Sequence, residues 1–403
     1  MHILFNRIFY VILFIGFFLP TNNKFYIPLP GILLSYNELA FLLLPIINLL
    51  CYSKNNVTIN SARIKRNIVL LFIVLVFTEV VVKNLVYGQS PGEAFKSIRI
   101  GLPLFSSLIL IVQGIRADVR IVWKTLLMAI CVSEILSYIS LVIDLPIYHG
   151  MEGSTNILEE KKGRLGTANS TFGIIGLYLL FEDKNKWYNQ GRLVKITAVL
   201  SLIGLLLGFN RTYLALLFLE GVYLTRRQFN VKKVLKILFF VGLILGMGVY
   251  IYNTNDIIKR QIDKRILSIV LGETDFKEAT IESNRDVIYD HIEARIKEDH
   301  WVIGLPYKKP IFIYYSIENE YLPHLKTDMS FINILLRYGF LVLLLCFVIL
   351  YLMYRNKNFI PIIFWVYFLA SLNIDSLLNQ NSVFFLFFFS FIINSNHNFK
   401  ELR

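Results

Sequence analysis

Residues 68–86 read IVLLFIVLVFTEVVVKNLV, and this run decides the class of fold. The hydrocarbon core of a bilayer is about 30 Å thick, so a helix that crosses it needs about 17–25 mostly apolar residues. Similar runs recur on both sides of this one. The sequence therefore predicts an all-α polytopic membrane protein with about twelve transmembrane helices, near residues 3–20, 32–51, 68–86, 98–115, 125–143, 165–181, 193–209, 212–225, 234–252, 330–354, 359–372 and 377–393.

The composition excludes several other classes of protein. The 403 residues are 56% hydrophobic and only 17% charged, whereas a soluble domain carries about 25% charged residues. A cytosolic enzyme, a disordered chain and a coiled coil all need more polar sequence. The three cysteines, Cys51, Cys131 and Cys346, show neither a pairing signature nor metal-ligand spacing. No cofactor motif is present, so neither a cofactor nor a metal ion is expected.

The net charge of +13 indicates an orientation in a membrane rather than a nucleic-acid partner. Lysines and arginines concentrate in alternate short loops, which predicts that both termini lie in the cytoplasm. Residues 254–328 form a much longer segment, which we expect to be a large extracytoplasmic loop with short helices of its own. The predicted organisation is nine spans in residues 1–253, this loop, and three spans with a short cytoplasmic tail in residues 329–403.

Three arginines are expected on the extracytoplasmic side: Arg164, Arg211 and Arg285. Each has an ordinary interpretation: Arg164 as a solvated loop charge, Arg211 as a side chain reaching the headgroups, and Arg285 on the polar face of an amphipathic helix. An ionisable group at membrane depth nevertheless suggests a function. Because a guanidinium offers a fixed fork of donors that suits phosphate oxygens, these residues predict an anionic ligand.

Two acidic residues, Glu79 and Glu134, stand inside predicted spans. They could mark a proton path. The more common arrangement is a pair with a polar group of a neighbouring helix.

The order of several short motifs resembles the superfamily of O-antigen polymerases and O-antigen ligases. These motifs are Arg164-Leu-Gly-Thr, then Gly208-Phe-Asn-Arg211-Thr, then a long loop with Arg285-Asp-Val-Ile-Tyr289 and Ile303-Gly-Leu-Pro306. The exit of the loop, residues 328–341 (DMSFINILLRYGFL), is similar to the stretch of that family that re-enters the membrane. The resemblance covers the chain from the first predicted span to the last.

The resemblance implies a glycosyltransferase with a GT-C-like architecture in the cytoplasmic membrane of a bacterium. It would transfer a glycan chain from polyprenyl diphosphate to a lipid-linked repeat unit at the outer face. Arg211 and Arg285 would neutralise the departing diphosphate. Arg164 and Tyr289 would bind substrate. The implied partners are the lipid-linked oligosaccharide and membrane lipids, together with chain-length regulator and flippase proteins.

The resemblance also implies a group that orients or deprotonates the acceptor hydroxyl. Asp328 is the first candidate, and His324 and Glu320 are weaker ones. Asp328 could equally be a helix N-cap, and His324 an ordinary loop residue. Ligases of the superfamily carry a histidine at the start of the re-entry stretch, where this chain has Asp328. This difference favours a polymerase.

Three alternatives remain open at the level of the sequence. A ligase would use the same chemistry with a different acceptor. A flippase or transporter of lipid-linked sugars usually shows internal repeats, and the two halves of this chain do not match. A peptidoglycan polymerase of the shape–elongation–division type also has a large outer loop, but its span count and loop position would differ.

Overall fold

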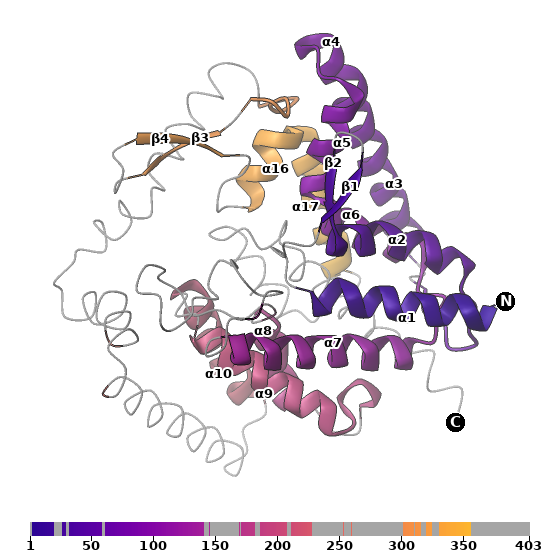
Figure 1. Ribbon diagram of the computed structural model, residues 1–403, viewed down its shortest axis with the longest axis vertical. Coiled ribbons are helices and arrows are strands. Elements are labelled where there is room, and N and C mark those ends of the chain that lie inside the picture. Colours follow the sequence, from indigo (N-terminus) through magenta and orange to yellow (C-terminus); the bar gives the residue numbers. More distant parts are fainter. Residues whose placement is uncertain are drawn as a thin grey trace. The chain divides into compact units, whose positions relative to one another are not determined.

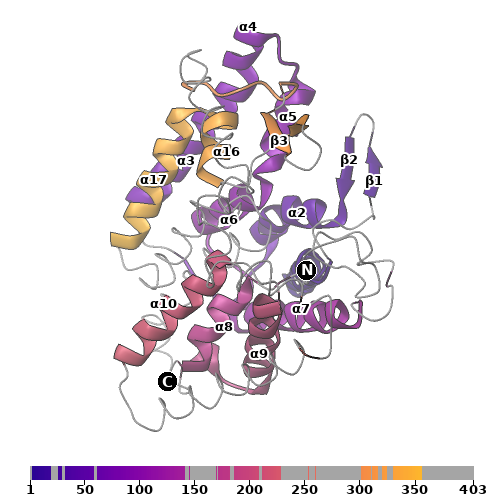
Figure 2. The ribbon, with the colours of Figure 1, turned by 90° about the vertical axis from the view of Figure 1, so that its left-hand side faces the viewer.

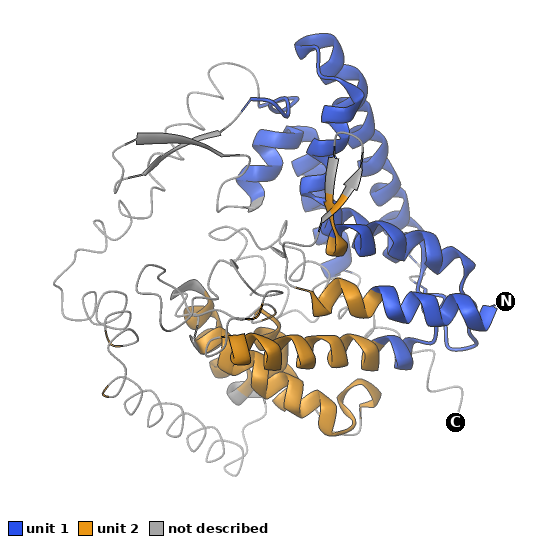
Figure 3. Ribbon diagram, in the orientation of Figure 1, with its two compact units in different colours: residues 1–12, 38–122, 276–403 blue, residues 13–37, 123–275 orange. Residues whose placement is uncertain are grey.

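The computed structural model shows that the described part of the chain is mostly helical. The chain divides into two compact units, which are coloured separately in Figure 3: unit 1 comprises residues 1–12, 38–122 and 276–403, and unit 2 comprises residues 13–37 and 123–275. The structure describes residues 2–19, 26–29, 32–58, 61–140, 145, 169, 171–181, 186–207, 211–227, 253, 259, 301–309, 311–315, 320–324 and 330–355.

A continuous helical rod from Ala62 to Tyr87 is the main element of unit 1 (Figure 1). It consists of α3 (Ala62–Val76), the π-helix η1 (Phe77–Val82) and α4 (Lys83–Tyr87). The Ser61 side chain accepts a hydrogen bond from the Ile64 N–H and so caps the first turn. Gly88, with a φ of 68°, ends the rod in the left-handed conformation that glycine adopts without strain.

Unit 1 also contains two helices that meet at a sharp bend. Helices α5 (Pro91–Ile100) and α6 (Leu102–Gln113) are inclined by 80° at Gly101. Ser90 and Glu93 form a complete capping box at the start of α5. A side chain at Gly101 would meet the Phe105 ring at 2.7 Å, so the bend itself is tightly packed.

The C-terminal helices of unit 1 are α16 (Ser330–Tyr338) and α17 (Phe340–Arg355). Helix α17 packs along α3, and the two lie side by side in both views (Figures 1 and 2). Strands β3 (Ile311–Tyr315) and β4 (Glu320–His324) precede them as an antiparallel hairpin.

Unit 2 is built around α8 (Phe172–Phe181), α9 (Arg192–Leu207) and α10 (Arg211–Arg227). A side chain on Gly173 would lie 2.7 Å from the Ser201 carbonyl oxygen, and one on Gly176 would lie 2.8 Å from that of Ala198. Glycine at these two positions therefore lets the α8 and α9 backbones touch. The same unit holds the hairpin of β1 (Tyr26–Leu29) and β2 (Ile32–Ser35) and the short helix η2 (Trp187–Asn189).

Three of the boundaries between the two units fall within helices. These helices are α1 (His2–Phe18), α2 (Tyr36–Leu50) and α7 (Val119–Ser140).

The predicted all-α class holds in the described residues, whereas the twelve predicted spans are not confirmed. In this part of the chain, one helix, Ala62–Tyr87, is long and apolar enough to cross a membrane, or two if the bent pair α5–α6 counts as one span. The rod exposes Ile73, Phe77 and Leu85, the kind of apolar surface that a bilayer covers. The predicted spans at 234–252, 359–372 and 377–393 lie outside the described residues.

Two predicted spans differ from the observed elements. Residues 32–35, expected to begin a helix, form strand β2, and the helix begins only at Tyr36. The run at 98–115 is interrupted at Gly101, because α5 ends there and Pro103 stands in the first turn of α6. Proline at that point is compatible with a helix start but not with a continuous helix through Gly101.

Candidate functional site

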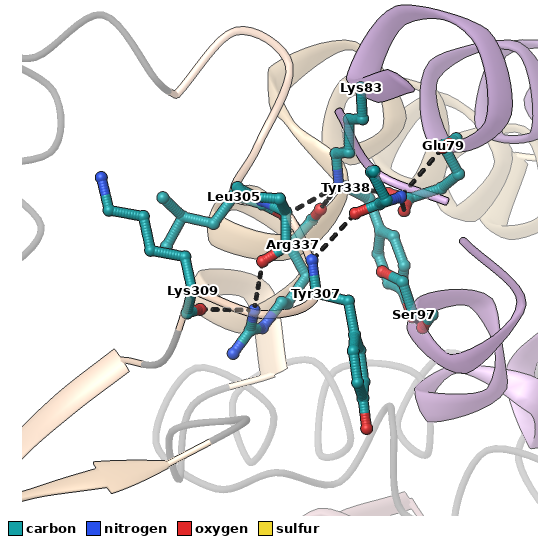
Figure 4. Close-up of polar contacts among 10 residues, drawn as sticks. Glu79, Lys83, Ser97, Leu305, Tyr307, Lys309, Arg337 and Tyr338 are labelled. Carbon is teal, nitrogen blue, oxygen red and sulfur yellow. Dashed lines mark hydrogen bonds and ion pairs between the residues drawn. The ribbon is translucent and has the colours of Figure 1, made fainter. Parts of the chain in front are cut away.

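Three charged side chains with no exposed surface lie together in unit 1, and we call them the Glu79–Lys83–Arg337 cluster (Figure 4). Glu79 and Lys83 come from the rod, and Arg337 comes from the last turn of α16. A buried charge is costly unless it is paired and hydrogen-bonded. The partners of each group therefore define what the site can do.

Lys83 has an acceptor for each of its three N–H donors. Its ammonium group forms an ion pair with Glu79 Oε1 and donates to the main-chain oxygens of Leu305, at 3.0 Å, and Arg337 (Figure 4). An ammonium has three donors and no acceptor, so its hydrogen-bonding capacity is filled. Lys83 therefore holds parts of the protein together and offers no free donor to a substrate.

The π turn explains why Lys83 points inwards. The buried positions of the rod include four residues spaced four apart: Leu71, Leu75, Glu79 and Lys83. In an α-helix, four residues turn through about 400°, so each step would move about 40° away from the buried face. The wider π turn takes up this drift, since the Lys83 N–H bonds to the Thr78 oxygen five residues earlier. The turn thus keeps the cation on the same face as the core residues.

Gln89 connects Glu79 to the segment at 301–309. Its side-chain amide donates to the Glu79 main-chain oxygen at 2.9 Å and to Glu79 Oε2 at 3.2 Å, while its own side-chain oxygen accepts from the Tyr307 N–H at 2.8 Å. The left-handed turn at Gly88 brings Gln89 back towards the rod, where its N–H bonds to the Lys83 oxygen. Both carboxylate oxygens of Glu79 therefore have partners.

Arg337 binds the same segment from the other side. Its Nη1 donates to the main-chain oxygens of Pro306, at 3.2 Å, and Lys309, at 3.0 Å (Figure 4). The guanidinium thus holds the turn at 306–309, while the main-chain oxygen of Arg337 accepts from Lys83. Side chain and main chain of one residue serve two different contacts.

Residues 301–305 and 336–340 touch backbone to backbone, and we call this contact the junction. The Leu305 N–H bonds to the Leu336 oxygen at 2.6 Å, and the Phe340 N–H bonds to the Trp301 oxygen at 2.9 Å. A side chain on Gly304 would meet the Arg337 oxygen at 2.6 Å, and one on Gly339 would meet the Val302 oxygen at 2.3 Å. The junction therefore requires glycine on both sides, and both adopt positive φ.

Two further contacts extend the site to α5. The Tyr338 hydroxyl donates to the Ser97 oxygen at 2.9 Å (Figure 4), and its ring stacks edge-on against Phe105 at 5.7 Å. The exposed Lys308 side chain forms an ion pair with Glu93 at 2.6 Å. The rod, the bent pair, the turn at 301–309 and the end of α16 thus converge on one polar cluster.

The structure places the residues predicted from the sequence unevenly. Arg164, Arg285, Tyr289 and Asp328 lie outside the described residues. Arg211 is the first residue of α10 in unit 2.

Glu320 and His324 begin and end strand β4 in unit 1, where they pair with Tyr315 and Ile311 respectively. The two candidates for the acceptor base therefore stand at opposite ends of one strand. The roles expected of all seven site residues stay predictions.

The sequence did not reveal Lys83, Gln89 and Arg337 as site residues. The spacing of Glu79 and Lys83, four apart within an apolar run, is a signal that could have found the ion pair. The sequence leaves a proton path or a pair with a neighbouring helix open for Glu79, and the structure shows a pair with Lys83 of the same rod and a bond from Gln89. Glu134 accepts a hydrogen bond from the Asn169 N–H at 3.0 Å.

In the part of the chain that the structure describes, no group of three or more His, Cys, Asp or Glu residues could hold a metal ion. No family model, no curated protein and no solved structure matches this chain. The function must therefore be argued from the residues themselves.

Proposed function

We propose that this protein is a polysaccharide polymerase of the cytoplasmic membrane of a bacterium, with both termini in the cytoplasm. It transfers a growing glycan chain from polyprenyl diphosphate to a lipid-linked repeat unit at the outer face, and so makes an O-antigen, a capsule or an exopolysaccharide. Its partners are this lipid-linked oligosaccharide and the surrounding lipids, together with chain-length regulator and flippase proteins.

One observation carries the proposal. The resemblance to the polymerase and ligase superfamily rests partly on two short segments of the long loop, residues 303–306 and 328–341. In the structure, these segments meet at the junction, where the Leu305 N–H bonds to the Leu336 oxygen and Gly304 packs on Gly339. Motifs that serve one site must lie together in space, and these two do.

The proposed chemistry needs neither a metal ion nor a nucleotide. The bond between the anomeric carbon and the diphosphate breaks, and a bond from this carbon to the acceptor hydroxyl oxygen forms. The hydroxyl proton passes to a basic group, with Asp328 as the first choice and His324 and Glu320 as weaker ones. Arg211 and Arg285 stabilise the charge on the departing polyprenyl diphosphate, while Arg164 and Tyr289 hold substrate.

The test is to incubate the purified protein with synthetic lipid-diphosphate repeat units and to separate the products by length. We expect a ladder of glycans from the wild-type protein and none from Arg211→Ala or Arg285→Ala. Arg66→Ala is the matched control, because Arg66 is an exposed arginine of α3. It should give the wild-type ladder.

Two results would decide against the proposal. If Arg211→Ala and Arg285→Ala both give a normal ladder, the arginines do not stabilise the leaving group. If a finished chain moves once, to a lipid acceptor, and no ladder forms, the protein is a ligase.

A further inference from the structure

Lys83 binds both ends of one long segment of the chain. Its ammonium donates to the Leu305 oxygen and to the Arg337 oxygen, which lie 222 and 254 residues further along the chain. These two oxygens belong to the two sides of the junction (Figure 4). One cation of the rod therefore holds the start and the end of residues 306–336 at the same place.

This segment contains all three candidates for the acceptor base. Glu320 and His324 stand on β4, which pairs with β3 to form the described hairpin, and Asp328 follows in the sequence. The hairpin is joined to the rest of the chain through the two ends of this segment, at Leu305 and Arg337. Both ends are bonded at the junction, and the junction is bonded to Lys83.

From this geometry we propose that Lys83 is a positioning residue for glycan transfer. By bonding the Leu305 and Arg337 oxygens to the rod, it anchors the two ends of the segment that carries the acceptor-activating group. The inference rests on the proposed function. It adds a residue of the rod to the machinery, far in the sequence from the loop motifs.

Two other roles for Lys83 fit the structure less well. Direct contact with substrate is excluded by its complete burial and by its three filled donors. Neutralisation of Glu79 would need only the ion pair, and Gln89 already satisfies the second carboxylate oxygen. Neither role explains why Lys83 donates two hydrogen bonds to main-chain oxygens of the junction.

The decisive variant is the double substitution Glu79→Leu with Lys83→Met. Lys83→Met alone would leave Glu79 buried without its counter-ion and could fail to fold. The double variant removes both charges of the ion pair together, Arg337 keeps its bonds to the Pro306 and Lys309 oxygens, and Gln89 keeps its bond to the main-chain oxygen of residue 79. It therefore removes the two bonds to the junction while sparing the membrane helix.

The first measurement is amide hydrogen exchange of the full-length protein in lipid nanodiscs. We expect faster exchange at the junction amides of Leu305 and Phe340 in the double variant. Arg99→Met is the matched control, since Arg99 forms an ion pair with Glu38 in the same unit, at 2.5 Å, and the structure records no bond from it to the junction. It should leave exchange at these amides unchanged.

The second measurement separates kcat from KM for ladder formation. Misplacement of a reacting group by about 1 Å costs about 100-fold in rate, so kcat should fall on this scale in the double variant. KM for the lipid-linked donor should stay within about twofold, because a positioning residue on the acceptor side acts mainly on the chemical step. A loss of folded protein would instead lower the amount of active enzyme and leave the exchange of the surviving fraction normal.

The outcomes are distinct. Unchanged exchange at Leu305 and Phe340 in the double variant, or a wild-type kcat, would overturn the inference. A wild-type protein that makes no ladder would overturn the proposed function and, with it, the catalytic role of Lys83. The exchange result would then still decide whether Lys83 holds the junction.

Discussion

The junction of unit 1 and the α8–α9 contact of unit 2 both rely on glycines that let backbones touch, but they differ in everything else. At the junction, the contact is bonded to a buried lysine from a segment more than 200 residues away. Between α8 and α9, helices that follow each other closely in the chain meet through Gly173 and Gly176. Small residues suffice to pack neighbouring helices in an apolar environment. The charges of unit 1 therefore serve a purpose other than packing.

Comparison of the two units shows what that purpose is. A buried ion pair contributes little net stability, but replacing only one of its partners lowers the free energy of unfolding strongly. Such a pair therefore fixes one particular arrangement of the chain. In unit 1, the two sides of the junction must be held against the rod, although they lie more than 200 residues further along the chain. No short connection in the chain brings them to the rod. Directed bonds from a charged group define this arrangement in a way that non-directional apolar contact does not.

The largest effect should come from breaking the ion pair on one side. Glu79→Leu leaves the Lys83 ammonium buried without its counter-charge, which should lower the free energy of unfolding by about 3–5 kcal/mol. Unfolding by SDS of protein held in a mild detergent measures it. A loss below about 1 kcal/mol would mean that the pair is not buried as described.

Glu220→Leu is the matched control for that substitution. Glu220 is a fully buried acid of α10 in unit 2, and its carboxylate oxygens have no hydrogen-bond partner among the described residues. Replacing an unsatisfied polar group by an apolar one should raise stability by about 1–3 kcal/mol. Opposite signs for Glu79→Leu and Glu220→Leu would confirm the contrast between the units.

A side chain at the junction should have the next largest effect. Gly339→Ala places a methyl group where it would meet the Val302 oxygen at 2.3 Å, at a φ of 86°. Strain and overlap together should cost about 3 kcal/mol, measured in the same unfolding assay. Gly92→Ala is the control, since nothing lies within 4 Å of the added atom, and it should gain about 0.5 kcal/mol.

The corresponding substitution in unit 2 should cost less. Gly176→Ala would press a methyl group against the Ala198 backbone at 2.8 Å, but the φ of Gly176 is compatible with alanine. Helices can separate slightly, so we expect a loss of about 2 kcal/mol in the unfolding assay. Gly221→Ala on α10 has open space around it and should be neutral or gain up to about 1 kcal/mol. Equal losses of stability for Gly176→Ala and Gly339→Ala would contradict the proposed difference between the two contacts.

The smallest effect should come from the rim of the cluster. Lys308 is 79% exposed, and its ion pair with Glu93 is open to water and salt. Lys308→Met should therefore leave the free energy of unfolding unchanged, both at low and at high salt concentration. A clear loss of stability would show that the turn at 301–309 depends on its exposed charges rather than on Lys83 and Arg337.

The sequence predicted the helical class, and it located the rod well. The run at 68–86 falls within the observed helix Ala62–Tyr87, because an apolar run of that length has few alternatives to a helix. The strand at residues 32–35 was not predicted, since its apolar residues look the same in a strand as in a helix. The break at Gly101 follows from Gly101 and Pro103, which the sequence shows, whereas the 80° angle was not predicted. Tyr338, which packs against Phe105 beside the bend, comes from a distant segment that no local pattern contains.

The cluster was harder to predict than the fold. Lys83 and Arg337 bond mainly to main-chain oxygens. Every residue has a main-chain carbonyl group, so the sequence does not show which residues accept these bonds. Gly304 and Gly339 stand in stretches that the family resemblance selected, so the resemblance marked the junction without saying that its two sides meet. Only the fold brings Leu305 and Leu336 within one hydrogen bond.

The π turn at Phe77–Val82 determines which deletions the rod can absorb. A π turn is an α-helix that has gained one residue, so removal of one of its residues would restore an ordinary helix and leave the following residues facing the same way. Loss of a single codon within the turn would therefore keep Lys83 directed at the junction. Loss of a codon in α3, before the turn, would instead rotate the preceding core residues by about 100° relative to Lys83, so that the apolar face of α3 and the cation would no longer point in the same direction.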